Sequence, residues 1–134
     1  MTLRRKSREF ALQMLFEWDM TRQEPSRVEK LFWKSARAAE STRDFANELF
    51  EGTVAQAGEI DAMVAKLAEN WRLDRLAAID RNILRLGIYE MRAGTAPPRV
   101  IIDEALELAK KFSSAEAPAF LNGVLDAALK NLAT

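Results

Sequence analysis

The sequence contains no cysteine and no histidine among its 134 residues. The missing cysteines exclude disulfides and thiolate nucleophiles. The missing histidines exclude imidazole bases and, together with cysteine, the usual ligands of zinc. Any acid–base or nucleophilic chemistry would have to rely on carboxylates, lysine, serine or tyrosine alone. We therefore expect no metal site and no cofactor.

Glycine and long apolar runs are also scarce. The chain has five glycines, and neither GxxxxGK[ST] nor GxGxxG occurs, so no phosphate-cradling loop is visible. Charged side chains interrupt every hydrophobic stretch, which excludes a membrane span. The opening stretch does not resemble a signal peptide, because FALQMLF contains Gln13 and is followed by Glu17 and Asp19. We expect a single cytoplasmic domain.

What the sequence does contain is helical periodicity along nearly its whole length, with no convincing period-two strand. We predict an all-α protein of about seven helices. The expected helices cover residues 7–20, a short segment opened by Pro25 and Ser26, a segment after Ser41 that Gly58 bends or divides, residues 75–92, residues 98–112, and a last helix through Asn122-Gly123.

The expected helices fall into two subdomains, residues 1–70 and 71–134, separated near the segment NWRLDRL. Residues 75–92 form the least amphipathic helix, which predicts a place at the centre of the domain. Asn122-Gly123 is a dipeptide typical of hairpins, but apolar residues continue through it at helical spacing, so a helix is favoured. A glycine tolerated there, at a cost of up to ~1 kcal/mol, indicates a close approach of another backbone.

Near its start the chain crowds four basic residues into five positions, Arg4, Arg5, Lys6 and Arg8. The protein is formally neutral, so the other 16 basic residues face all 20 acids and leave the body acidic. Any affinity for a polyanion must therefore be local to this cluster. Two interpretations stay open: a solvated chain end, or an arginine-rich RNA-binding segment whose guanidinium groups bind phosphates.

Two further charged sets stand in the second half. Arg81, Arg85 and Arg92 share the expected central helix, where we interpret them as a solvated stripe, with an extension of a binding surface as the alternative. Three acids are grouped on the helix that follows, at Asp103, Glu104 and Glu107. Without histidine nearby, we expect these acids to form an exposed helix face or an acidic protein-docking surface, and not a catalytic pair.

Four stretches resemble a known family. The opening RRKSREFALQMLFEW and the later runs DRNILRLGIYEM, VIIDEALELAKKF and FLNGVLD resemble the bacterial transcription antitermination factors of the NusB family. The resemblance covers about residues 4–130, with the motifs in the family's order and spacing, whereas residues 21–70 share only the helical pattern. It implies an all-helical fold of two subdomains with three to four helices each.

The resemblance also implies a function without catalysis. NusB proteins pair with NusE, a small-subunit ribosomal protein, and the pair binds the boxA element of nascent, single-stranded RNA, particularly in ribosomal RNA leaders. The complex joins RNA polymerase with NusA and NusG and suppresses termination. For the protein without NusE, both a monomer and a homodimer stay open.

Family positions carry over to named residues. The implied RNA surface comprises Arg4, Arg5, Lys6 and Arg8 in the basic arm, Phe16 at the first-helix aromatic position, Asp80, and Glu116 with Phe120 around the last helix. An aromatic ring can stack on an unpaired base, and a carboxylate can accept a hydrogen bond from a base edge. The chain departs from the family at Asp103, at Ser113 where glycine is usual, and at Ala117-Pro118, where a capping serine is missing.

Two alternatives from other classes remain. The same helical domain occurs fused to RNA cytosine methyltransferases, so this chain would then be an accessory region, since it contains no domain that binds the methyl donor. The third interpretation is a purely protein-binding helical adaptor whose basic end is only solvated. Binding to boxA-type RNA, with and without NusE, separates the three.

Overall fold

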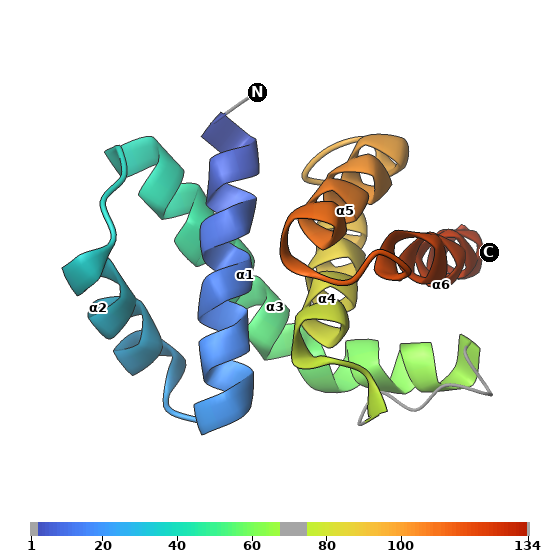
Figure 1. The fold of residues 1–134 in the computed structure, drawn as a ribbon, viewed down its shortest axis with the longest axis horizontal. Helices are drawn as coiled ribbons and strands as arrows, with labels where there is room; N and C mark the ends of the chain where they lie inside the picture. Colours follow the sequence, from blue (N-terminus) through green and yellow to red (C-terminus); the bar gives the residue numbers. More distant parts are fainter. Residues whose placement is uncertain (1–2, 68–74, 134) are drawn as a thin grey trace.

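The computed structural model describes residues 3–67 and 75–133, and every regular element in these ranges is a helix. The order is α1 (Leu3–Thr21), α2 (Pro25–Ser35), α3 (Glu40–Leu67), α4 (Ala78–Ala93), α5 (Pro98–Phe112) and α6 (Ala117–Leu132). In Figure 1, α1 stands in the centre, with α2 on one side and α4, α5 and α6 on the other, while α3 passes behind α1. The all-α prediction is confirmed.

Proline and glycine set several helix boundaries where the sequence predicts them. Pro25 and Pro98 stand in the first turn of α2 and α5, where the missing N–H would have no helical partner in any case. Gly94 adopts a left-handed φ of 70° and ends α4 by donating its N–H to the Glu90 carbonyl at 2.8 Å. The last helix runs through Asn122-Gly123 without a break, so the helical pattern outweighs the hairpin dipeptide.

The predicted count of about seven helices differs from the six in the described residues because α3 is not divided. It is continuous from Glu40 to Leu67, although Figure 1 shows it changing direction along its length. Ala57 and Ile60, on either side of Gly58, are both buried, so tertiary packing outweighs the cost of about 1 kcal/mol for a helical glycine. The predicted boundary between residues 70 and 71 lies outside the described residues, and the division into two subdomains stays a prediction.

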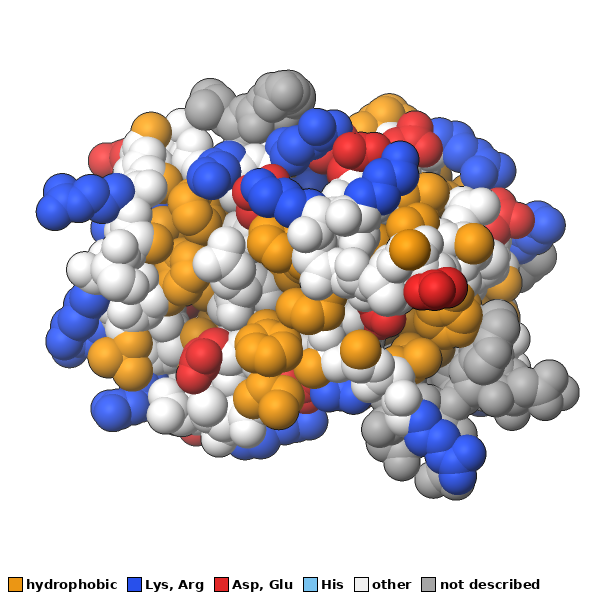
Figure 2. All heavy atoms as spheres, viewed as in Figure 1, with side chains coloured by type: hydrophobic (Ala, Val, Ile, Leu, Met, Phe, Trp, Pro, Cys, Tyr) orange, Lys and Arg blue, Asp and Glu red, His pale blue; other side chains and the backbone are white. Residues whose placement is uncertain are grey.

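The surface seen in Figure 2 combines both kinds of side chain. Lysine and arginine lie mainly around the edge of this face, and hydrophobic side chains gather in its middle. Among residues 3–67 and 75–133, no helix is both long enough and apolar enough to cross a membrane.

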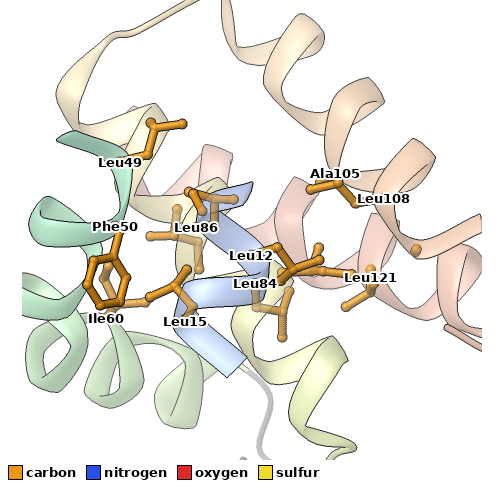
Figure 3. Packing of buried hydrophobic residues seen from close by; sticks show 14 of the residues in the cluster. Leu12, Leu15, Leu49, Phe50, Ile60, Leu84, Leu86, Ala105, Leu108 and Leu121 are labelled. Atoms are coloured by element: carbon orange, nitrogen blue, oxygen red, sulfur yellow. The ribbon is translucent and has the colours of Figure 1, made fainter. Parts of the chain in front are cut away.

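One cluster of buried hydrophobic residues includes side chains from all six described helices. Figure 3 shows Leu12 of α1 and Leu84 of α4 near its centre, with residues of α3 on one side and of α5 and α6 on the other. Helix α4 is buried without interruption from Asn82 to Ile88, which confirms its predicted central place. The core thus fixes α1 against the second half of the chain.

Helices approach each other closely at glycines other than the predicted one. A Cβ atom added at Gly123 would meet nothing within 4 Å, so the expected close approach there is wrong for the described residues. A Cβ at Gly52 of α3, in contrast, would overlap the ring of Tyr89, and one at Gly87 of α4 would lie 3.1 Å from Leu125. The contacts that require a small residue therefore surround α4.

Candidate functional site

The basic cluster near the start belongs to α1 itself and is not an arm that precedes it. Successive residues of an α-helix point about 100° apart, so neighbouring side chains meet different surroundings. Arg4 and Lys6 are exposed, Arg5 is half-buried and Arg8 is buried. Arg4 lies over the Phe45 ring, 4.2 Å from its centroid, and donates to the Thr95 carbonyl at 3.1 Å.

Arg8 does not belong to the exposed surface, which corrects its expected role as a phosphate contact. Its guanidinium donates from Nε to Glu90 Oε2 and from Nη2 to Glu90 Oε1, both at 2.8 Å, and Thr95 Oγ1 donates to the same carboxylate at 2.7 Å. The Arg8 and Glu90 side chains are only 5% and 2% exposed. A forked guanidinium fits a carboxylate with two parallel bonds, so Arg8 joins α1 to α4.

Arg5 is also paired within the molecule, but at the surface. It donates from Nε and Nη2 to the two oxygens of Glu104 on α5, at 3.0 and 2.8 Å. The hydrogen bond from Arg5 lowers the pKa of Glu104 below its ordinary value, although burial acts in the opposite direction. The same pairing raises the pKa of Arg5. Arg5 is therefore held in place while part of its guanidinium still faces solvent.

Glu9 connects two lysines on neighbouring helices. Lys111 Nζ, at the end of α5, donates to Glu9 Oε1 and Oε2 at 3.0 and 3.1 Å, and Lys6 Nζ lies 3.7 Å from Glu9 Oε1. Glu9 and Lys111, together with the Arg5–Glu104 pair, line a hollow between α1 and α5 that also includes Glu107, Leu108 and Lys110. Sequence reasoning missed Lys110 and Lys111, although adjacent lysines at a helix end were a visible signal.

Phe16, on α1, borders an apolar groove of about 470 Å³ that α2 lines from the other side. Phe16 is 36% exposed and Leu31 of α2 is 41% exposed, so the groove presents apolar surface to solvent. Ile79 and Phe112 contribute from the second half of the chain. The other lining residues are Leu12, Gln13, Glu17, Gln23, Val28, Phe32 and Ser35. Flat aromatic walls with a few amide and hydroxyl groups can hold a planar, polar-edged ligand.

Asp80 lies beside this groove, next to Ile79 in the first turn of α4. Ser113 Oγ donates to Asp80 Oδ1 at 2.5 Å, and Ser113 directly follows Phe112 of the groove. A glycine at position 113, usual in the family that the sequence resembles, could not make this bond. The departure therefore ties the connection between α5 and α6 to the start of α4.

Glu116 and Phe120 stand at the start of α6 and do not line the groove. Glu116 is exposed, and no side-chain cap bond forms there, in line with the missing serine. Pro118 lies in the first turn of α6, so the helix begins without that cap. Phe120 is half-buried and packs against the core. The structure thus places Phe16 in the groove and Asp80 beside it, and leaves Glu116 and Phe120 beyond it.

The expected solvated stripe of Arg81, Arg85 and Arg92 is wrong for Arg81 and Arg85, which form ion pairs inside the protein. Arg85 is buried and donates from Nε and Nη2 to Asp61 at 2.9 and 2.8 Å, while Arg81 Nη2 lies 2.6 Å from Asp19 Oδ2. Asp19 also accepts from Asn82 at 3.1 Å. Burial raises the pKa of Asp19, but the arginines lower it by more, so the net shift is downward. These charges join α1 and α3 to α4.

Two of the three acids of α5 form ion pairs with basic residues. Glu104 is occupied by Arg5, Glu107 pairs with Lys110 at 3.2 Å, and Asp103 is exposed. Among residues 3–67 and 75–133 no group of three acids could hold a metal ion. The site therefore offers cations, an apolar groove and hydrogen-bonding groups, which are means of binding.

Known proteins are similar to this sequence along nearly its full length. The sequence model of the NusB family matches residues 5–130. The transcription antitermination protein NusB of Koribacter versatilis is 47% identical over 131 residues, which cover 96% of this chain and 90% of the relative.

Solved structures share the fold as well. NusB of T. maritima matches with a TM-score of 0.85 at 31% identity, covering 95% of this chain and 90% of that one. A chain from the crystal structure of antitermination factors NusB and NusE in complex with double-stranded RNA matches with a TM-score of 0.88 at 28% identity, over 98% of both chains. The family match, the close relatives and the shared helical fold together show that this chain belongs to the NusB family of transcription antitermination proteins.

Proposed function

We propose that this protein binds single-stranded, boxA-type RNA together with NusE, and that the complex supports processive transcription. In this proposal NusA, NusG and RNA polymerase join the same assembly, in the cytoplasm. Members of the NusB family are antitermination proteins and not enzymes. The protein therefore acts by recognition alone, and its side chains need to hold and orient RNA without changing it.

The observation that carries this proposal is the continuity of two features along α1. Arg5 and Glu9 line the charged hollow, whereas Gln13 and Phe16, one and two turns further on, line the apolar groove. The end of α5 follows the same order, because Lys111 borders the hollow and its neighbour Phe112 borders the groove. Cations beside exposed aromatic rings suit single-stranded nucleic acid, whose phosphates and bases alternate on the same scale.

The proposed roles divide accordingly. Arg4, Arg5 and Lys6 supply phosphate contacts, and Arg8 supports them from the interior by holding α1 against α4. Phe16 stacks on a base, Asp80 with Ser113 meets a base edge, and Glu116 and Phe120 extend the surface along α6. Three phosphate contacts predict a slope of about −2 for log K against log salt on a single strand.

NusE completes the surface in this proposal. A related chain of the same fold occurs in a complex of NusB, NusE and double-stranded RNA, which supports a shared NusE and RNA assembly. A few phosphate contacts and one groove give weak binding alone, so a second protein that adds contacts to the same RNA increases the overall affinity. We expect weak RNA binding by the isolated protein and clearly tighter binding once NusE is present.

A titration of labelled boxA-type RNA tests the proposal. The protein is added with and without NusE at several salt concentrations, and a scrambled RNA of equal length serves as the reference. Equal affinity for boxA and scrambled RNA under all conditions would contradict the proposal and return the protein to the class of protein-binding adaptors. Size-exclusion chromatography across protein concentrations shows whether a homodimer competes with RNA binding.

Two sets of variants test the assigned residues. Replacing Arg4, Arg5 and Lys6 with Ala should reduce the magnitude of the salt slope by about 2, whereas replacing the exposed cations Lys30, Lys34 and Lys66 should leave it unchanged. Phe16→Ala should weaken binding by roughly 1–3 kcal/mol, the effect of losing one stacked base, and Phe16→Tyr should retain affinity. An unaltered slope in the first variant would mean that the start of α1 is only solvated.

A further inference from the structure

The hollow between α1 and α5 is nearly neutral, although it contains the basic residues nearest the chain start. Three basic residues, Arg5, Lys110 and Lys111, and three acidic residues, Glu9, Glu104 and Glu107, line it. The acids come from within α1 and from α5, about a hundred residues away in sequence. The positive cluster of the sequence is therefore largely compensated where it would meet RNA.

Glu104 engages Arg5 in the manner of a phosphate. Its two oxygens accept parallel hydrogen bonds from Nε and Nη2, which is the arrangement that guanidinium groups also use to bind phosphate oxygens. Glu104 is 15% exposed and well fixed, whereas the Arg5 side chain is 42% exposed. A phosphate that approaches from solvent can reach Arg5, but it meets a guanidinium whose best donor edge is already occupied.

Glu9 restrains the two lysines in the same way. Its carboxylate lies 3.0 Å from Lys111 Nζ and 3.7 Å from Lys6 Nζ, so one acid holds cations from two helices. Glu9 is 10% exposed, whereas Lys6 and Lys111 are 58% and 55% exposed. The acids thus lie beneath the cations, and the cations are accessible above them.

We propose that Glu104 and Glu9 limit the affinity of this surface for RNA, because they hold Arg5, Lys6 and Lys111 in internal ion pairs with which RNA phosphates must compete. This inference rests on the proposed RNA function, and it adds that carboxylates of the protein itself limit the affinity for RNA. Weak binding by the isolated protein then follows from its own carboxylates, and specificity is left to the groove and to NusE. The restraint acts on phosphate contacts, so it is independent of RNA sequence.

Glu104→Gln tests the proposal, since the amide keeps the size of the side chain and removes its charge. RNA affinity is measured for boxA-type and scrambled RNA at 50 to 300 mM salt, with and without NusE. We expect binding of both RNAs to be about fivefold tighter at the lowest salt, because the free energy of one exposed ion pair no longer opposes it. The salt slope should stay at about −2, because Arg5 is already one of the three phosphate contacts and only the competition from Glu104 is removed.

Glu59→Gln is the matched control. Glu59 forms an exposed ion pair with Arg92 at 3.1 Å, and both residues line a different hollow, so this variant makes the same change in net charge elsewhere. A double-mutant cycle adds Arg5→Ala and the Arg5→Ala, Glu104→Gln pair. If Glu104 acts through Arg5, the gain from Glu104→Gln largely disappears when Arg5 is absent. Glu9→Gln is a second, independent variant and should also tighten binding.

The outcomes separate this inference from the proposed function. If the wild-type protein binds RNA with NusE but Glu104→Gln binds equally or more weakly, the carboxylates position the cations and do not restrain them, and only this inference is wrong. A similar gain in Glu59→Gln would show an effect of net charge and would also overturn it. If neither wild type nor variant binds boxA-type RNA in preference to scrambled RNA, the proposed function itself fails.

Discussion

Two of the helices that line the apolar groove, α1 and α2, are attached to the protein in different ways. Charged groups hold α1 along its whole length. Arg8 pairs with Glu90 of α4 at one end, and Asp19 pairs with Arg81 of α4 at the other. Arg5 and Glu9 form further ion pairs with Glu104 and Lys111 of α5. Opposite charges thus fix one wall of the groove to the second half of the chain.

Aromatic contacts hold α2. The rings of Phe32 and Trp33 meet Phe10 of α1 edge-on, with centroids 5.7 and 5.2 Å apart. Trp33 Nε1 donates to Asn47 Oδ1 of α3 at 2.8 Å. One turn earlier, Glu29 of α2 interacts with a second acid, Glu51 of α3, so the next polar contact joins two carboxyl groups.

This difference indicates that the groove has one firmly held wall and one that depends on a few contacts. The firmly held wall includes Phe16 and continues into the basic hollow, whereas the other wall presents Leu31. A binding surface built on α1 is therefore preorganised, which reduces the entropy lost on binding. Mutations that remove one attachment at a time test whether the two walls differ in this way.

Arg8→Met should have the largest effect. The variant leaves Glu90 buried without its cation, which typically costs about 3–5 kcal/mol. Chemical denaturation should show this loss, whereas Arg4→Ala, at the exposed end of the same helix, should change stability by less than about 1 kcal/mol. The double variant Arg8→Met, Glu90→Leu should recover much of the loss, because the interior then holds no unpaired charge. A loss below about 1 kcal/mol in Arg8→Met would contradict the view that charge pairing fixes α1.

Trp33→Phe should have a smaller effect, on α2. The ring contacts with Phe10 are largely kept, but Asn47 Oδ1 loses its donor, which typically costs about 1–3 kcal/mol for a buried polar group. Asn47→Ala removes the acceptor as well and should restore part of the stability in the double variant. Thermal unfolding measures both. If Trp33→Phe destabilises as much as Arg8→Met, the two walls are held equally firmly and the comparison fails.

The fold was largely predictable from the sequence because its signals are local. Pro25, Gly94 and Pro98 mark boundaries through their own backbone preferences, and hydrophobic spacing within a few residues defines the helices between them. Gly58 does not divide α3, because the packing of the residues around it, which is not a local signal, keeps the helix continuous. The family motifs added the function, which periodicity alone could not supply.

The site was less predictable because partners lie far apart in sequence. Arg8 and Glu90 are separated by 82 positions and Arg5 and Glu104 by 99, so nothing near the basic cluster shows which of its members is neutralised. Position on the helix decides exposure, and the cluster spans more than one face. The groove likewise combines residues of α1, α2, α4 and α5, which no single stretch of sequence brings together.

The contact between Glu29 of α2 and Glu51 of α3 predicts a distinct pH dependence of stability. Burial and the neighbouring carboxyl of Glu51 raise the pKa of Glu29 from 4.5 to about 8, and Glu29 Oε2 is buried without a hydrogen-bond partner among the described residues. The folded protein therefore keeps a proton on Glu29 that the unfolded chain releases above its ordinary pKa. Unfolding releases this proton, so the contribution of Glu29 to stability is complete below about pH 4.5 and is lost as the pH rises through about 8.

Glu29→Gln isolates this contribution, since the amide carries no charge at any pH and can donate to Glu51. The free energy of unfolding of wild type and variant is compared from pH 5 to pH 9, and the variant should gain relative to wild type until about pH 8 and then run parallel. The chain has no histidine, so few other side chains titrate in this window. Glu24→Gln, which removes an exposed acid at the start of α2, is the control and should show no such trend. Parallel curves for Glu29→Gln and wild type across the whole range would mean that Glu29 is ionised in the folded protein, and that the α2 wall is not weakened by rising pH.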